Sequence, residues 1–176
     1  MELFSFSVDS LGSSTLQILP MLILLGCGLV LKLLDAFGIT KPLGWLAGLG
    51  LAASGLTAIL MESSGSSPAF FGMMETGGIA PLVHLFICIA GFLTLFFLQE
   101  YLNRYEKNIP DVYALLTFAV LGMVMLANAN DFIMSFIGLE TMSICLYIFA
   151  ALYKTDSRST EAGLKYFLLG AFASAF

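Results

Sequence analysis

Long apolar runs alternate with short polar segments along the whole chain. A helix needs roughly 20 mainly apolar residues to cross the hydrocarbon core of a bilayer, which is about 30 Å thick. Five runs approach that length and a sixth is open at the C-terminus: residues 16–31, 43–61, 79–98, 112–127, 132–153 and 161–176. The last run is still apolar at Phe176, so we expect the native protein to continue with more helices. The pattern predicts an all-α, polytopic transmembrane helix bundle with about six spans.

Composition excludes a water-soluble domain. Hydrophobic residues make up 59% of the chain and charged residues 11%, with a mean hydropathy of +0.97. A soluble domain has about 45–50% apolar and about 25% charged residues. The seven basic residues form no stripe that could hold phosphates, which excludes nucleic acid as a partner. The expected surroundings are therefore the lipid bilayer.

The distribution of positive charge predicts the orientation of the chain. The tail of residues 1–15 has no Lys or Arg, so the first run lacks the basic region of a signal peptide and is predicted to be retained as a span. Basic residues occur in alternate connections: Lys32 and Lys41, then Arg104 and Lys107, then Lys154 and Arg158. Lys and Arg are enriched on the cytoplasmic side of membrane proteins. We therefore expect the N-terminus on the outer side.

Glu140 is the most informative residue, because it lies about eight residues into the fifth run. At roughly 12 Å from the outer end of a helix it would lie near the middle of the bilayer. Inserting an acid there costs about 2.5–3.5 kcal/mol on translocon scales, so we expect it to face the bundle interior. A proton-binding group whose charge depends on its neighbours is suited to relaying protons.

Lys165 is the one basic residue outside the basic connections, and it lies about four residues into the sixth run. It either takes part in proton transfer or extends to the cytoplasmic interface. A helical hairpin around residues 155–159 would place Glu140 and Lys165 about 12 Å apart along the helix axis, too far for a direct ion pair. At an effective dielectric constant near 20, their charges would still interact by about 1.4 kcal/mol.

The other polar features carry weaker predictions. Residues 62–78 are rich in Ser and Gly and are expected to form a flexible, passive outer loop. His84 is either a proton relay or, the interpretation we favour, a buried imidazole bonded to a neighbour. Gly44 and Gly48 would allow another helix to approach closely. The cysteines lie singly in different runs and are expected to be apolar fillers, so we expect no metal and no bound cofactor in this chain: Cys27, Cys88 and Cys145.

Several segments resemble one known family. They are the stretch FIGLETMS at residues 136–143 with the following Leu146-Tyr147, the stretch RSTEAGLKYF at residues 158–167, and LGMVMLANAND at residues 121–131. They are similar to the fourth, fifth and sixth helices of the antiporter-like membrane subunits, and most of all to subunit N of bacterial NADH-quinone oxidoreductase, respiratory complex I. The resemblance is specific over residues 113–175 and general in the first three helices.

The resemblance implies the N-terminal portion of an antiporter-like fold of about fourteen helices. Residues 1–15 would be an outer tail, residues 16–111 three transmembrane helices, and residues 112–176 the start of a proton-channel module. In the family, the Glu that matches Glu140 forms part of a proton channel with a Lys of the seventh helix, and the Lys that matches Lys165 belongs to the same polar axis. Both are therefore our candidate proton-transfer residues.

The resemblance also implies a function and a location. The chain would belong to a proton-translocating, non-redox subunit that couples quinone reduction to proton pumping and has no catalytic activity alone. NADH, FMN, iron-sulfur clusters and quinone would be bound by other subunits, and the partners would be other membrane-arm subunits. The location would be a bacterial inner membrane, with a periplasmic N-terminus. A free-standing cation/proton antiporter and a purely structural membrane-arm scaffold remain the alternatives.

Overall fold

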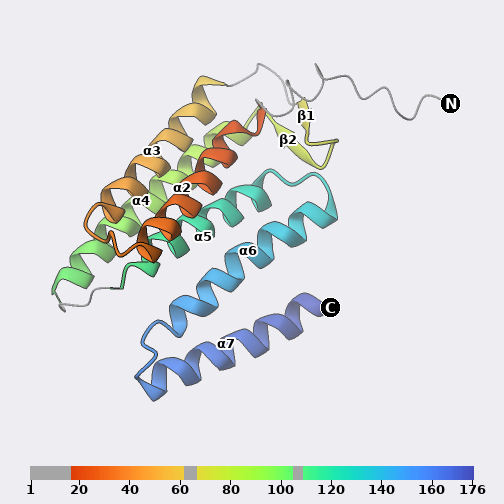
Figure 1. The fold of residues 1–176 in the computed structure, drawn as a ribbon. Coiled ribbons are helices and arrows are strands. Elements are labelled where there is room, and N and C mark those ends of the chain that lie inside the picture. Colours follow the sequence, from red (N-terminus) through yellow and green to blue (C-terminus); the bar gives the residue numbers. More distant parts are fainter. Residues whose placement is uncertain (1–16, 62–66, 105–108) are drawn as a thin grey trace.

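The computed structural model describes residues 17–61, 67–104 and 109–176. The predicted outer tail of residues 1–15 and the basic residue Lys107 lie outside the described residues. Six helices and a two-stranded hairpin make up the described part (Figure 1): α2 (Leu19–Ala36), α3 (Leu43–Leu60), β1 (Ser67–Ala69), β2 (Met74–Thr76), α4 (Ala80–Arg104), α5 (Asp111–Ala127), α6 (Phe132–Ala150) and α7 (Ser157–Ala175).

Each predicted apolar run corresponds to one helix, which confirms the all-α prediction. Three helices extend several residues beyond the apolar run into polar sequence, and the first of them, α2, continues past residue 31 to Ala36. The third run was expected to end at residue 98, whereas α4 continues to Arg104. The sixth was expected to begin at residue 161, whereas α7 begins at Ser157, because the Asp156 carboxylate accepts a hydrogen bond from the backbone N of Arg158 at 3.0 Å. Hydropathy marks the apolar part of a helix and does not show its polar ends.

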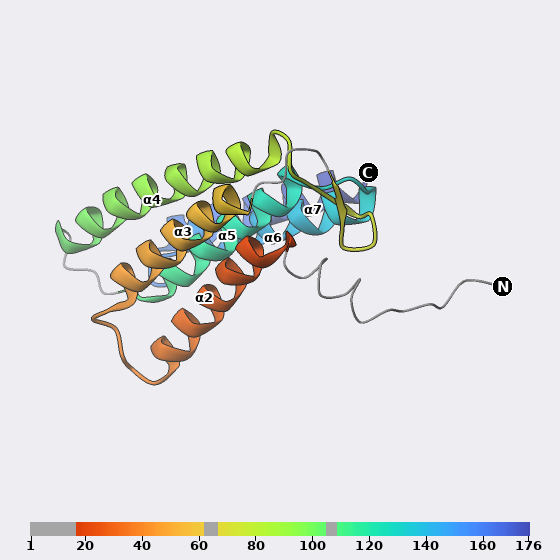
Figure 2. The ribbon, with the colours of Figure 1, turned by 90° about the horizontal axis from the view of Figure 1, so that it is seen from above.

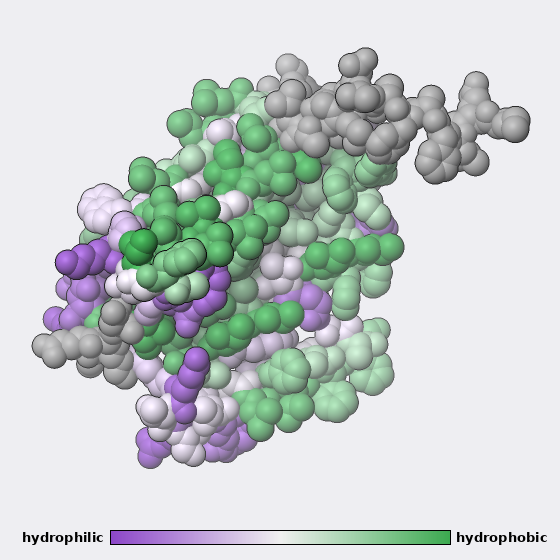
Figure 3. Space-filling model, viewed as in Figure 1, coloured by the Kyte–Doolittle hydropathy of each residue, from purple (hydrophilic) through white to green (hydrophobic). Residues whose placement is uncertain are grey.

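The helices have lengths and surfaces suited to lipid. Four of the described helices, α2, α3, α4 and α6, are long and apolar enough to cross a membrane, and α5 is apolar but only 17 residues long. Large apolar side chains are exposed along the helices, including Trp45 of α3, Phe86 of α4 and Leu169 of α7. Hydrophobic residues cover much of the helix sides in Figure 3, while hydrophilic residues gather toward the end that holds the α6–α7 connection.

Helices α2 to α5 pack together, α6 packs on α5, and α7 packs on α6 at the edge of the bundle (Figures 1 and 2). Two apolar cores hold the first four helices together. One is built around the fully buried Leu24, Leu51 and Val124, and the other around Leu31 and Leu43. The predicted close approach at Gly44 and Gly48 is confirmed, because side chains of α4 and α5 pack directly over them.

The main chains of α5 and α6 meet directly at a pair of glycines. A Cβ atom added at Gly122 would lie 2.5 Å from the backbone N of Met142, and one added at Gly138 would lie 2.6 Å from the backbone N of Leu126. Only hydrogen fits at either position, since both obstructing atoms belong to the backbone. The two glycines therefore set the distance between the main chains of α5 and α6.

The connection between α3 and α4 differs from the flexible loop expected there. Its described part contains an antiparallel hairpin in which Ser67 pairs with Thr76 and Ala69 with Met74. Gly72 has a φ of +81°, which a tight turn tolerates in glycine. The hairpin gives these residues a defined main-chain structure that the Ser- and Gly-rich composition did not indicate.

The hairpin is also bonded to the turn between α5 and α6. The backbone N of Glu75 donates to the carbonyl O of Asn128 at 2.9 Å, and the backbone N of Asn130 donates to the carbonyl O of Met73 at 2.9 Å. Met74 is 3% exposed and packs into the first apolar core. Sequence missed this contact because its partners lie more than 50 positions away along the chain. We refer to this side of the bundle as the hairpin end.

Candidate functional site

Glu140 lies near the middle of α6, eight residues after Phe132 and roughly 12 Å from the start of the helix. The residue is partly buried, and its Oε1 atom is fully buried with no hydrogen-bond partner among the described residues. A buried carboxylate is costly unless a donor or a cation compensates it. The predicted inward position is therefore supported at this oxygen, but the expected partner is not found in the described part of the chain.

The neighbours of Glu140 explain why its oxygen lacks a donor. The Thr141 hydroxyl donates to the carbonyl O of Ile137 at 2.8 Å, one turn earlier in α6. Gly138, two residues before Glu140, brings the main chain of α5 against α6 at this level. Main-chain groups of both helices are already hydrogen-bonded within each helix. Two residues correspond to about 200° of helix rotation, so Glu140 lies on the face of α6 opposite Gly138, and its Oε1 atom is buried without a donor among the described residues.

Lys165 lies on α7 and is exposed, with 70% of its side chain accessible. Its Nζ atom is 2.5 Å from the Oε1 atom of Glu161, one turn earlier. No ion pair joins Lys165 to Glu140 in the described residues, as the predicted axial offset requires. Our sequence reasoning missed Glu161, although the spacing of four residues between Glu161 and Lys165 is the signal for such a pair on a helix.

Aromatic side chains fix α7 against α6. The Tyr147 ring packs edge-on against Tyr166, with centroids 4.9 Å apart, and against Phe167, with centroids 5.8 Å apart. At the turn, the Ser159 hydroxyl donates to the carbonyl O of Ala150 at 2.9 Å and accepts from the backbone N of Tyr153 at 3.1 Å. These contacts position the helix that carries Lys165 relative to the helix that carries Glu140.

An ion pair that sequence did not predict joins α2 to α5 at the end opposite the hairpin. Lys32 pairs with Asp111 across the two helices and with Asp35 on its own helix at 3.4 Å. Lys32 is 55% and Asp111 39% exposed, so solvent screens the pair and its contribution is at most about 1 kcal/mol. The pair joins two helices in packing and is far from Glu140 along the helix axes.

His84 is buried in α4, with 4% of its surface exposed, and its Nε2 atom lies 2.8 Å from the Ser54 hydroxyl of α3. The prediction of a buried imidazole bonded to a neighbour is confirmed. The three cysteines are free thiols. Across residues 17–61, 67–104 and 109–176, no group of three or more His, Cys, Asp or Glu side chains is placed to hold a metal.

Comparisons with known proteins agree in sequence and in fold. Residues 129–176, which include Glu140 and Lys165, match the family model described as NADH:quinone oxidoreductase/Mrp antiporter, TM. The chain is 39% identical, over 86% of its length, to NADH-quinone oxidoreductase subunit N of Salinibacter ruber, covering 30% of that protein. It is 37% identical, over 89% of its length, to subunit N of Rhodospirillum rubrum, covering 33% of it.

The fold matches a solved structure as well. A chain of respiratory complex I from Thermus thermophilus with bound aureothin superposes with a TM-score of 0.72 and 27% identity, over 89% of this chain and 34% of that one. The chain spans about a third of the length of the relatives it matches. With its apolar helices, it is embedded in the membrane. The chain therefore belongs to the family of antiporter-like membrane subunits that includes subunit N of NADH-quinone oxidoreductase.

Proposed function

We propose that the chain is part of a proton-translocating membrane-arm subunit of NADH-quinone oxidoreductase, in which Glu140 binds and releases a proton. The observation that carries the proposal is the buried Glu140 Oε1 atom without a hydrogen-bond donor in the described residues. A proton or an approaching cation would satisfy this oxygen, so the two charge states of Glu140 respond to neighbouring charge. The same residue lies in the segment that matches the antiporter family.

Electrostatic interaction between charged groups would link Glu140 to the rest of the complex. This chain would contain no redox centre. Quinone reduction in other subunits would shift charge along a buried polar line and change the proton affinity of Glu140. Lys165, which is exposed in the described part of the chain, would act as a second proton-transfer group. At about 12 Å and an effective dielectric constant near 20, the interaction between the two charges is about 1.4 kcal/mol. Water molecules would be needed to carry a proton across that gap.

The proposed location is a bacterial inner membrane, with the hairpin end on the periplasmic side. The last residues of α2, α4 and α6 and the first residues of α3, α5 and α7 lie at the opposite end (Figure 1), and six of the seven basic residues occur in or near the sequence that connects them. The positive-inside rule assigns that end to the cytoplasm. Other membrane-arm subunits would be the partners, and NADH, FMN, iron-sulfur clusters and quinone would be bound outside this chain.

The direct test removes the charge of Glu140 by Glu140→Gln in the complete subunit, assembled with its partners. Proton pumping and quinone reduction are measured on the same preparation. The proposal predicts a loss of pumping at normal assembly. Unchanged pumping at normal assembly would leave the chain a structural scaffold of the membrane arm.

A free-standing cation/proton antiporter is the second candidate, because the matched family model covers Mrp antiporters as well. Such a protein would use the same buried acid but would need no partner subunit. Reconstituting the complete subunit alone in vesicles separates the two functions. Cation-dependent proton movement without partners would favour the antiporter, and its absence would favour the respiratory complex.

Lys165→Ala is expected to have a smaller effect than Glu140→Gln. Its ion pair with Glu161 is exposed, and such pairs contribute about 0–1 kcal/mol to stability. We expect normal assembly and a pumping rate that falls less than for Glu140→Gln. Comparison with Glu161→Ala identifies the cause: equal effects indicate the ion pair, while a loss confined to Lys165→Ala indicates a proton-transfer role for the lysine.

A further inference from the structure

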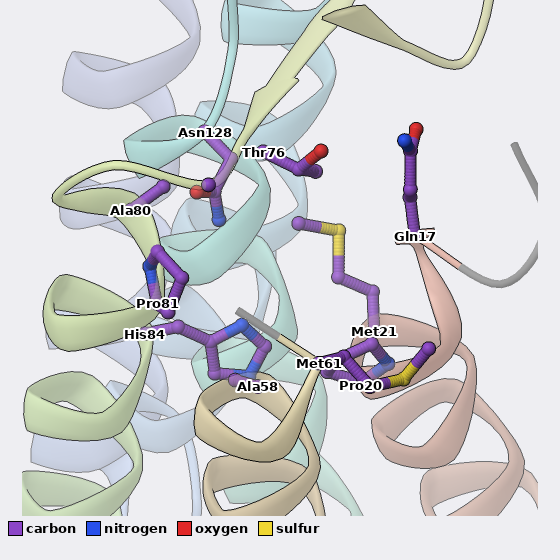
Figure 4. A pocket seen from close by; sticks show the side chains of 11 residues that line it. Gln17, Pro20, Met21, Ala58, Met61, Thr76, Ala80, Pro81, His84 and Asn128 are labelled. Atoms are coloured by element: carbon purple, nitrogen blue, oxygen red, sulfur yellow. The ribbon is translucent and has the colours of Figure 1, made fainter. Parts of the chain in front are cut away.

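A partly polar cavity of about 80 Å³, open on one side, lies at the hairpin end of the bundle, away from Glu140 (Figure 4). His84 forms one wall, and Gln17, Thr76 and Asn128 contribute polar side chains around it. A site needs about 10–15 Å³ of such volume, and several polar partners, to hold one water molecule. The cavity therefore has room for a small cluster of water.

The hydrogen bonds around Ser54 determine which nitrogen of His84 carries the proton. The Ser54 hydroxyl donates its single hydrogen to the carbonyl O of Pro20 at 2.7 Å. Ser54 can then only accept from the Nε2 atom of His84, which lies 2.8 Å away. A neutral imidazole has one donor and one acceptor nitrogen. Nε2 thus holds the hydrogen, and Nδ1 keeps its lone pair.

The Nδ1 atom faces the cavity. Figure 4 shows the second ring nitrogen of His84 directed toward the space between Asn128 and Met21, opposite the nitrogen that meets α3. The Asn128 amide nitrogen donates to the carbonyl O of Val124 at 2.8 Å, which fixes that side chain at the cavity wall. An unprotonated imidazole nitrogen that faces a polar cavity is a proton acceptor.

We propose that this cavity is a hydrated proton-binding site, in which Nδ1 of His84 takes a proton from water in the cavity. A hydronium ion would give its proton to Nδ1, leaving one water molecule and an imidazolium with hydrogens on both nitrogens. Ser54 would keep the ring oriented in both charge states, because Nε2 donates to it throughout. The site does not depend on proton pumping by Glu140.

Among the described residues that line the cavity, His84 is the only acid or base. The residues that face His84 from the neighbouring elements are all uncharged. They are Ser54 and Ala58 of α3, Pro20 and Met21 of α2, Asn128 at the end of α5, and Thr76 and Gly77 of the hairpin segment. In the described part of the chain, the Cys88 thiol, which interacts with Ser54, and the exposed Glu75 beside Thr76 are the titratable groups nearby. Water and dipoles, rather than a counter-ion, would therefore stabilise the imidazolium.

The chain contains a single histidine, which makes the site directly observable. The full chain is labelled with ¹⁵N-histidine and studied by NMR in nanodiscs between pH 4 and 8. We expect one pyrrole-type nitrogen, Nε2, and one pyridine-type nitrogen, Nδ1, which becomes protonated as the pH falls and shows contact with water. A pyrrole-type Nδ1, or a spectrum that does not change over this range, would overturn the proposal.

Three variants separate the cavity from general packing. Ser54→Ala removes the acceptor of the Nε2 hydrogen. His84 should then still titrate, but its neutral form should be a mixture of the two tautomers. Ala58→Leu fills the cavity and should remove the water contact and lower the titration midpoint by about one pH unit, a tenfold change in proton affinity. Ala52→Leu adds the same volume on the exposed side of α3 and should change neither. An Ala58→Leu spectrum and midpoint like those of the unaltered chain, with helix content preserved, would show that the cavity plays no part.

Discussion

Glu140→Gln is expected to lower proton pumping by the assembled complex roughly tenfold or more, because a positioned proton-transfer group contributes about 10²–10⁴-fold to its step. The amide has nearly the shape of the carboxylate, so the α5–α6 contact should remain intact. Removing a buried carboxylate that lacks a donor also removes a desolvation cost, so stability should not fall. Pumping is measured as acidification of vesicles, alongside quinone reduction and subunit content.

Glu161→Gln is the matched control for this change. It is the same substitution on an acid that is 60% exposed and paired with Lys165. We expect pumping to stay close to that of the unaltered complex. A loss of equal size in both variants would mean that the loss of negative charge in this region, and not the burial of Glu140, accounts for the effect.

Gly138→Ala and Gly122→Ala are each expected to force α5 and α6 apart. The new methyl carbon would lie 2.6 Å or 2.5 Å from a backbone nitrogen of the facing helix, so the two main chains would have to move apart. Overpacking of this kind costs about 1–3 kcal/mol, which exceeds the gain of up to about 1 kcal/mol from replacing Gly by Ala in a helix. We expect a lower midpoint of thermal unfolding. Unfolding is measured in nanodiscs as the loss of the helical circular dichroism signal.

Gly26→Ala provides the control for the glycine variants. No atom lies within 4 Å of a Cβ placed at Gly26 in α2, so the added methyl group meets open space. The substitution should leave stability unchanged or raise it slightly. If Gly138→Ala and Gly122→Ala behaved like Gly26→Ala, the close contact of α5 and α6 would contribute nothing to the stability of the chain.

Sequence predicted the number, type and approximate position of the helices, because a span of hydrocarbon demands a minimum length of apolar residues. It could not predict the hairpin of residues 67–76, whose main-chain partners are Asn128 and Asn130. The sequence correctly indicated that glycines allow helices to approach closely, but it indicated Gly44 and Gly48. The main-chain contact at Gly122 and Gly138 depends on which helices are neighbours, and a single sequence does not contain that information.

The candidate site was predicted in part. The depth of Glu140 followed from counting residues along an apolar run, and the lack of a direct pair with Lys165 followed from helix rise. Sequence could not show that nearby donors such as Thr141 are already bonded within α6. It also could not assign the tautomer of His84, which depends on a serine 30 positions away whose own hydrogen is given to Pro20.

The bonds between the hairpin and the α5–α6 corner have a mechanical consequence. Main-chain hydrogen bonds donated by Glu75 and Asn130 join the turn just before α6 to the hairpin. At its other end, α6 leads into a short connection and packs with α7 through Tyr147. Any swing of α6 would thus pivot about the tethered corner, and its displacement would grow along the helix. Glu140, midway along this lever, would travel about half as far as Ala150.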